Sequence, residues 1–349
     1  MLRCAMFRSS RSTTRTLQYH THQKLFITQL DQGTFIAPHA SLNAVFKPGS
    51  FGGQLMAQAL SSASQSCNEN YIATSQVSSF LAPVLLGKDV HYKVSTVRES
   101  GQTFITKRVA AFQSSTTDPN SQANDSLLFE STISFYKPSA DPKSYATPAA
   151  TLPDSDSISL ENSLSLTELQ QEIKNNPTAS RRALYKFALK LNMALSESDM
   201  LMTVRVCDNN GNKKNTGNTN YLVGVDERLL ESKAENSALS LAQKNNIEKV
   251  ILPYVSDGMT QVLACADAMD EVFEGWPSKL TVWNYGIWFE ENALAAIPKS
   301  KSIDGKRWFV VSYSISGVIG GICNGRVQIY SYENKNLLAS STFSALMLE

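Results

Sequence analysis

Residues 47–64 of this 349-residue chain read KPGSFGGQLMAQALSSAS, a turn followed by a helix. One proline and three glycines stand in the first seven positions, a composition that interrupts regular structure and predicts a tight turn. From Gln54 onward the apolar residues recur at the spacing of one helical face, which predicts a helix over residues 54–64. Its small Ala and Ser side chains would let a sheet wrap closely around it.

Runs rich in β-branched and aromatic residues follow this helix. The clearest, residues 90–97, reads VHYKVSTV and alternates as a half-buried antiparallel strand does. A Ser/Thr/Asn/Asp/Pro tract at residues 114–126 predicts an enlarged hairpin loop. Strands are expected at residues 72–80, 90–97, 104–113 and 127–136.

The second half of the chain repeats this order. A polar tract at residues 208–220 predicts a loop between two strands, and a helix then leads to the sequence YVSDG at residues 254–258. A small-residue helix is expected next, at residues 259–269. Strands are expected at residues 201–207, 221–226, 280–290, 308–316, 325–332 and 338–347. One helix against mostly antiparallel strands, occurring twice, predicts an α+β fold made of two similar units.

A Ser/Pro/Asp/Ala-rich stretch at residues 138–160 separates the two halves and predicts an inter-domain linker. Two helical patterns follow it, at residues 167–174 and 180–195. We therefore divide the chain into an N-terminal unit at residues 25–138, a linker with helices at residues 139–198, and a C-terminal unit at residues 199–349.

The composition argues against several functional classes. Lys plus Arg (32) nearly equals Asp plus Glu (31), which disfavours a nucleic-acid binder or a membrane-surface protein. Apolar runs are too short for a membrane span. Five dispersed cysteines and four histidines, all of the histidines within the first 91 residues, show no spacing typical of a zinc site or a disulfide framework. We expect no metal and no cofactor.

Residues 1–24 contain five basic residues and no acidic one, because the first carboxylate of the chain is Asp31. Arg8, Arg11 and Arg15 would share one helical face, with apolar residues roughly opposite. An Arg-rich, Ser-rich, acid-free amphipathic leader is typical of a mitochondrial presequence. The alternative is a basic tail without defined structure. The last residues do not form a peroxisomal targeting tripeptide.

Several short stretches resemble the acyl-CoA thioesterase II family, and the chain looks like a divergent fungal-type member of it. Residues 51–60, FGGQLMAQAL, are similar to the family's FGGQ…GQAL motif, and YVSD at residues 254–257 is similar to its YxSD. The further matches, in the same order as in the family, are SSFLAP at residues 78–83, KRVAAFQ at 107–113, IWF at 287–289 and LASS at 338–341.

The resemblance implies a double hotdog, in which two hotdog units of one chain form a pseudo-dimer. It also implies hydrolysis of fatty acyl-CoA without a covalent intermediate, by a carboxylate, a hydroxyl and a Gln that position the attacking water. By this resemblance Asp257 is the catalytic carboxylate and Ser316 the hydroxyl. A carboxylate can accept a proton from water, a role typically worth about 10²–10⁴-fold in rate. The residues alone favour a helix N-cap for Asp257 and a polar position on an alternating strand for Ser316.

The third member of this site is replaced, because the family's Gln falls on Phe343, which has no hydrogen-bonding group. The substrate-binding candidates are Gly52 and Gly53, as the N-terminus of a helix that can approach a carbonyl oxygen, and Lys107 and Arg108, as contacts for CoA phosphates. Gly52 and Gly53 could instead serve packing alone, and the two cations could be solvated surface residues.

Two functions therefore remain open. The first is an acyl-CoA thioesterase of fatty-acid metabolism in mitochondria, with acyl-CoA as its partner. The second is a catalytically weak or inactive double hotdog that binds acyl-CoA or a protein. Self-association into a homo-oligomer is left open.

Overall fold

The computed structural model describes the following residues: 25, 27–38, 44–46, 49–85, 87–101, 103–114, 125–138, 150–152, 158–175, 188–189, 192, 202–207, 218–226, 239–257, 261, 263–265, 279–290, 303–319 and 321–348. The predicted leader at residues 1–24 lies outside these residues. So do most of the loops predicted at 114–126 and 208–220, and most of the helix predicted at 180–195.

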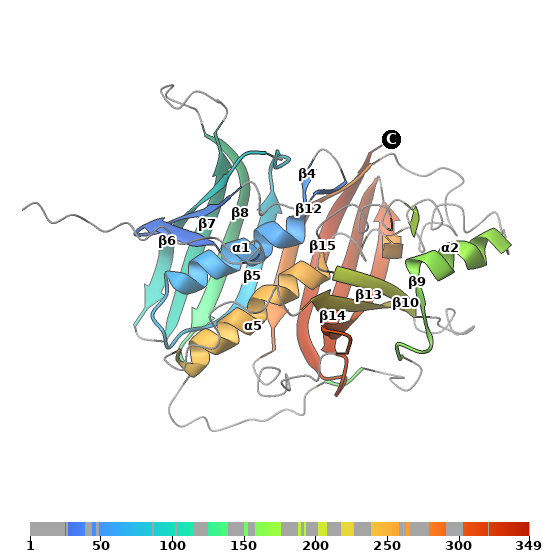
Figure 1. Ribbon diagram of the computed structural model, residues 1–349. Helices are drawn as coiled ribbons and strands as arrows, with labels where there is room; N and C mark the ends of the chain where they lie inside the picture. Colours follow the sequence, from blue (N-terminus) through green and yellow to red (C-terminus); the bar gives the residue numbers. More distant parts are fainter. Residues whose placement is uncertain are drawn as a thin grey trace, which may run out of the picture.

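A 13-stranded antiparallel sheet runs through both halves of the chain (Figure 1). In sheet order its strands are β1 (Thr28–Asp31), β2 (Thr34–Ala37), β6 (Val90–Ser100), β7 (Phe104–Gln113), β8 (Ser126–Tyr136), β5 (Ile72–Phe80), β12 (Lys279–Phe289), β15 (Leu337–Leu348), β14 (Ile322–Ser331), β13 (Lys306–Ile319), β11 (Asn218–Asp226), β10 (Met202–Cys207) and β9 (Ser163–Ser165). β3 (Ala44–Phe46) and β4 (Gly49–Ser50) form a separate pair. The predicted α+β class is confirmed, and the main strands lie where the sequence patterns place them.

The two units join edge to edge at the pair β5–β12. Val77 of the first unit lies opposite Gly286 of the second, in antiparallel register. The Ser79 hydroxyl also donates to Asn284 Oδ1 across this seam, at 2.9 Å. Because backbone hydrogen bonds cross the seam, the sheet is continuous rather than a pair of separate sheets.

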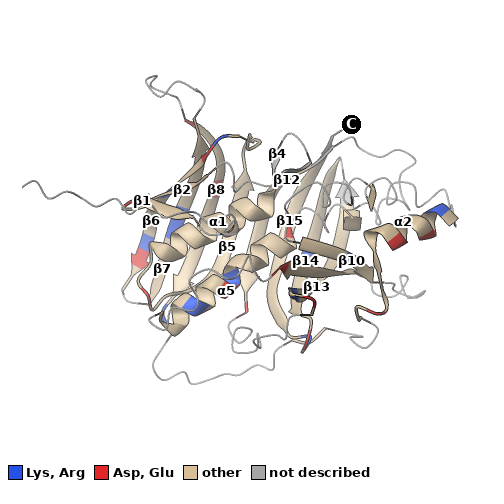
Figure 2. Ribbon diagram, in the orientation of Figure 1, with Lys and Arg blue, Asp and Glu red and all other residues tan. Residues whose placement is uncertain are grey.

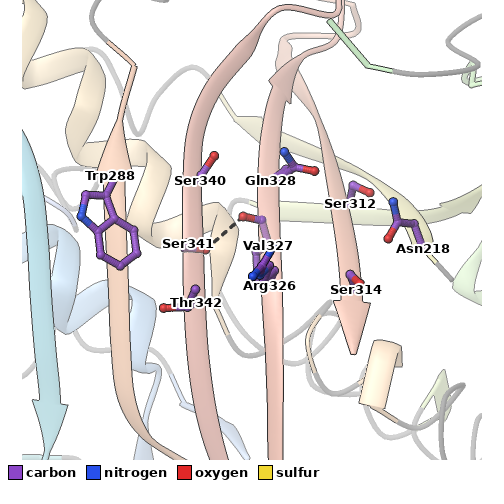
Figure 3. A pocket seen from close by; sticks show the side chains of 10 residues that line it. All are labelled: Asn218, Trp288, Ser312, Ser314, Arg326, Val327, Gln328, Ser340, Ser341 and Thr342. Atoms are coloured by element: carbon purple, nitrogen blue, oxygen red, sulfur yellow. Dashed lines mark hydrogen bonds between the residues drawn. The ribbon is translucent and has the colours of Figure 1, made fainter. Parts of the chain in front are cut away.

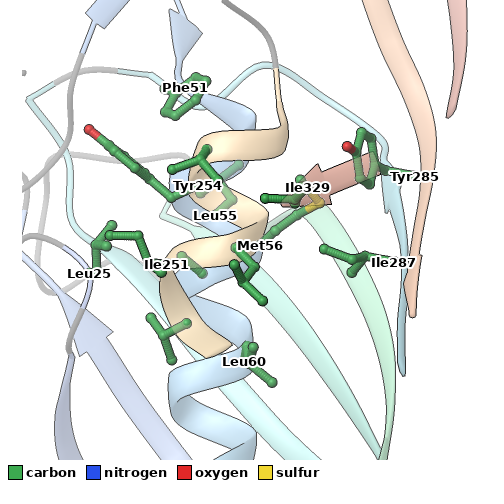
Figure 4. Close-up of a cluster of buried hydrophobic side chains, with 14 of the residues drawn as sticks. Leu25, Phe51, Leu55, Met56, Leu60, Ile251, Tyr254, Tyr285, Ile287 and Ile329 are labelled. Atoms are coloured by element: carbon green, nitrogen blue, oxygen red, sulfur yellow. The ribbon is translucent and has the colours of Figure 1, made fainter. Parts of the chain in front are cut away.

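Two helices lie side by side across one face of the sheet (Figure 1). They are α1 (Gly52–Gln65) from the first unit and α5 (Leu241–Ser256) from the second. Phe51 and Tyr254 meet edge to face between them, with ring centroids 5.1 Å apart. Figure 4 shows how Met56 and Ile251 from the helices, and Ile287 from β12, fill the space between helices and sheet. Figure 2 shows few charged residues on the central strands beneath these helices.

The helix that packs beside α1 is α5, which ends before the small-residue helix expected at residues 259–269. Within that range only Gln261 and residues 263–265 are described, and they are helical. α5 contains several polar residues, so its burial cannot be recognised from the sequence. Asn246 bonds the backbone of Tyr71 and Ala73 in the first unit, and Lys249 Nζ donates to the Ala73 carbonyl at 2.6 Å. Both side chains are buried, and their polar groups are satisfied by backbone groups at the start of β5. These hydrogen bonds join α5 to the first unit.

The range predicted as a linker contributes regular structure to the second unit. β9 pairs with β10, and α2 (Leu166–Asn175) follows it directly. Leu152 and Ile158 are buried in a second apolar cluster with Leu222 and Val310. These residues belong to β11, β13 and the linker, so part of the linker packs on the second unit's sheet.

Candidate active site

Asp257 and Gly52, far apart in the sequence, meet where α5 ends and α1 begins. Asp257 follows the last residue of α5 in an extended conformation and is 4% exposed. A Cβ atom added to Gly52 would lie 2.7 Å from Asp257 Oδ2, and one added to Gly53 would lie 2.9 Å from the Pro253 carbonyl oxygen. The glycines are therefore needed for the close approach of the two helix ends. The carboxylate lies at the N-terminus of α1, where N–H groups and the helix dipole favour negative charge.

Two tyrosines of the sheet hold the end of α5 that carries Asp257. The hydroxyls of Tyr285 and Tyr313 both donate to the Ser256 carbonyl oxygen, at 2.9 and 2.8 Å. Tyr285 Oη also lies 2.9 Å from Ser341 Oγ. Burial raises the pKa of Tyr285 and the negative charge of Asp257 raises it further, so this hydroxyl stays protonated as a donor. The position of Asp257 thus depends on β12 and β13 as well as on its own helix.

Phe343, at the position that the resemblance assigns to a Gln, faces the same cluster. Its ring stacks on Tyr285 with centroids 6.5 Å apart and meets Tyr313 edge on at the same distance. A Cβ added to Gly325 would lie 2.5 Å from this ring, so Gly325 leaves the space that the ring fills. Phe343 is 3% exposed. An apolar ring therefore stands where the resemblance places a polar amide.

Ser316 is exposed and lies in a bulge of β13, between Ile315 and Gly317. It is three residues beyond Tyr313, or about 10 Å along an extended strand. None of the contacts of the described residues joins Ser316 to Asp257. Its role as the site's hydroxyl stays a prediction.

Lys107 and Arg108 lie on β7, away from Asp257. Lys107 Nζ donates to Thr96 Oγ1 at 2.9 Å, and Arg108 forms an ion pair with Glu130. The charge of Lys107 acts on the thiol of Cys67, just after the C-terminus of α1. α1 has 14 residues and is about 20 Å long, and Asp257 lies at its other end. The structure does not bring these cations to the carboxylate, and their role toward CoA phosphates stays a prediction.

A groove of about 480 Å³ lies on the second unit's sheet (Figure 3). Trp288, Arg326, Gln328, Ser340 and Thr342 line it together with neighbouring polar residues, but neither Asp257 nor Ser316 does. Along β14 and β15 these polar side chains alternate with Val327 and Ser341, which are buried. A guanidinium, an indole and several hydroxyls could bind a small anionic or hydroxyl-rich molecule. Ser341 also lines the groove and contacts Tyr285, so the groove borders the cluster that anchors Asp257.

The described residues contain no group of three or more His, Cys, Asp or Glu side chains that could hold a metal ion. Within the same residues, no helix is both long and apolar enough to cross a membrane.

Several solved structures share this arrangement of sheet and helices. The TesB protein of Mycobacterium avium subsp. paratuberculosis is 14% identical, covers 94% of this chain and 98% of its own, and has a TM-score of 0.59. The acyl-CoA thioesterase II TesB2 of Mycobacterium marinum is 15% identical over 94% and 96%, with a TM-score of 0.54. A hot dog fold protein of Alicyclobacillus acidocaldarius is 13% identical over 94% and 98%, with a TM-score of 0.53. This chain has the double-hotdog fold of the acyl-CoA thioesterase II proteins. No protein-family model matches the sequence, and no curated protein matches it significantly.

The resemblance found in the sequence is therefore confirmed for the fold, over almost the whole chain. The assignment to a fungal type stays a prediction. Within the double hotdog, the residues that the sequence analysis missed are the tyrosines that anchor the site, Tyr285 and Tyr313. Both are buried in the sheet, where a hydroxyl needs a partner. That partner, the Ser256 carbonyl, lies on a different element, so the strand pattern alone could not identify it.

Proposed function

We propose that this double hotdog hydrolyses fatty acyl-CoA thioesters to a free fatty acid and CoA, with Asp257 as the base that activates water. One observation carries the proposal: the Asp257 carboxylate is buried against Gly52 at the N-terminus of α1. A proton acceptor and the N–H groups of a helix end are then close together. The family resemblance of both stretches and the shared fold support the choice of substrate.

In the proposed reaction, water attacks the thioester carbonyl carbon while Asp257 takes a proton from it. Negative charge develops on the carbonyl oxygen, and the first-turn N–H groups of Gly52 and Gly53 would stabilise it. The carbon–sulfur bond then breaks, CoA leaves as a thiolate, and Asp257 returns the proton to the sulfur. The tyrosine hydroxyls on the Ser256 carbonyl hold Asp257 in place throughout.

The test measures release of the CoA thiol from saturated acyl-CoAs of several chain lengths. Asp257→Asn should lower turnover by about 10²–10⁴-fold, because an amide is nearly isosteric with the carboxylate but cannot accept the proton. The matched control is Asp304→Asn, since Asp304 is exposed in a turn with φ of 56°, a conformation that Asn adopts readily. Brisk hydrolysis that survives Asp257→Asn would show that other residues catalyse the reaction.

A second candidate, a protein that binds acyl-CoA without hydrolysing it, is favoured by Phe343. The ring of Phe343 lies in the cluster that anchors Asp257 and has no group that could orient water. Under this alternative, wild-type protein binds a non-hydrolysable thioether analogue of acyl-CoA but releases no CoA thiol from any acyl-CoA.

We propose further that residues 1–24 direct the chain to mitochondria. The support is the arginine face without acidic residues, which suits import into that compartment. A role in fatty-acid metabolism would follow from this location and the proposed substrate.

A further inference from the structure

Two buried thiols of the second unit lie against each other. Cys265 stands on the helical stretch at residues 263–265, and Cys323 stands on β14. Their sulfur atoms are 3.5 Å apart and share an S–H hydrogen bond, although 58 positions separate the two residues. Both side chains are fully buried. Simple packing of small apolar residues does not require two sulfurs to meet, so this pair differs from scattered core cysteines.

We propose that Cys265 and Cys323 form a redox site, in which a peroxide converts the two thiols into a reversible disulfide. A disulfide needs the sulfurs about 2.05 Å apart. The two sulfurs must therefore come about 1.5 Å closer than their 3.5 Å separation. Because both residues are already within contact distance in the folded chain, no unfolding is needed to bring them together.

The chemistry balances with hydrogen peroxide as the oxidant. The Cys323 thiolate attacks one peroxide oxygen, the O–O bond breaks, and a sulfenic acid and one water form after proton transfer. The Cys265 sulfur then attacks the sulfenic sulfur, the S–O bond breaks, and a second water leaves. Two thiols are oxidised by two electrons in total, and the peroxide is reduced to two waters.

The hydrogen bond between the two thiols shifts their pKa values in opposite directions. The hydrogen bond with Cys265 lowers the pKa of Cys323, while burial opposes this effect. The same hydrogen bond raises the pKa of Cys265, and burial raises it further. The reaction is written with Cys323 as the attacking thiol; the reverse order gives the same disulfide and the same two waters.

The other described cysteines serve as internal controls. Burial raises the pKa of Cys67 to about 11 and that of Cys207 to about 12. Neither contacts a second sulfur among the described residues. Both should remain thiols under conditions that oxidise the pair, since a thiol is a poor nucleophile and no resolving sulfur is near.

The disulfide would tie the helical stretch that follows Asp257 to strand β14. Cys323 lies opposite Ala345 of β15 and Val318 of β13, so the link would attach the helical stretch to the end of the sheet where β13 turns into β14. The redox site is independent of the proposed hydrolysis, and its test needs no enzymatic activity.

The experiment treats the folded full-length protein with hydrogen peroxide, then denatures it in the presence of an alkylating reagent and digests it without reductant. Mass spectrometry should find one cross-linked peptide pair containing Cys265 and Cys323, two hydrogens lighter than the sum of its parts. Dithiothreitol should restore both thiols before alkylation. Hydrogen peroxide suits the buried pair because it is about as small as water.

Variants separate this pair from incidental oxidation. Cys207→Ala should give the same cross-link as wild type, whereas Cys265→Ala should give none, because Cys323 then lacks its neighbouring sulfur. Two results would overturn the proposal: both thiols fully alkylated after peroxide treatment of the folded protein, or a cross-link that includes Cys67 or Cys207 as often as this pair. If a variant fails to fold, the cross-linking result of the wild-type protein decides the question by itself.

Discussion

Lys249 offers the sharpest test of the packing between the two units. It is 1% exposed, its ammonium donates to the Ala73 carbonyl, and it lies 5.5 Å from the centre of the Phe289 ring. Burial lowers its pKa from 10.5 to about 7. In the unfolded chain the ordinary pKa of about 10.4 returns. Replacing this residue by Met removes the charge and keeps an unbranched chain of similar length.

The sign of the pH dependence follows from this difference. Between about pH 7 and pH 10 the unfolded chain holds a proton on Lys249 that the folded chain does not, so the free energy of unfolding rises with pH. For a folded pKa of about 7, the rise between pH 7 and pH 9 is about 2 kcal/mol. Well below pH 7 Lys249 is protonated in both states and its contribution becomes constant.

The assay is urea unfolding at pH 7 and pH 9 for wild type, Lys249→Met and the control Lys244→Met, in which an exposed Lys of the same helix is replaced. Lys249→Met should lack the rise of about 2 kcal/mol, whereas Lys244→Met should keep it. Any change in packing acts equally at both pH values, so the difference in pH dependence between the two proteins reports the titration of Lys249. Equal slopes for wild type and Lys249→Met would refute the reasoning that burial shifts this pKa.

Three further predictions concern the site and the leader. Gly52→Ala should lower CoA release by about 10-fold or more, because its Cβ would displace the Asp257 carboxylate; the measurement is turnover with a long-chain acyl-CoA. Phe343→Gln should raise turnover by up to about 10²-fold, the usual value of one positioned polar group, while it lowers thermal stability through the lost stack on Tyr285. A fluorescent reporter fused behind residues 1–24 should enter mitochondria, and the chain without them should stay in the cytosol.

Each of these three predictions would be contradicted by a defined result. Gly87→Ala is the control for Gly52→Ala, since no atom lies near its Cβ position and any effect there comes from its φ of 83° alone. Unchanged turnover in a folded Gly52→Ala protein would separate Asp257 from catalysis. A folded Phe343→Gln protein with wild-type turnover would mean that no amide is needed there. A reporter that remains cytosolic would contradict the presequence.

The local patterns determined much of this fold. The alternation of VHYKVSTV places a strand at residues 90–97, and β6 indeed begins at Val90 and continues to Ser100. The one-face spacing after Gly53 likewise places α1. Such patterns work because a strand or helix that buries one face must repeat apolar residues at its own period. They also carried the resemblance to the double-hotdog proteins, since ordered short motifs survive where overall identity is about 14%.

Only the tertiary structure decided which distant residues meet. Asn246 and Lys249 look like surface residues of a polar helix, yet backbone groups of β5 in the other unit accept or donate their hydrogen bonds. In the same way, the approach of Gly52 to Asp257 depends on two helix ends packed on one sheet. Burial and hydrogen bonding between distant segments leave no periodic trace in a sequence, because each partner satisfies its polar group only once the chain has folded.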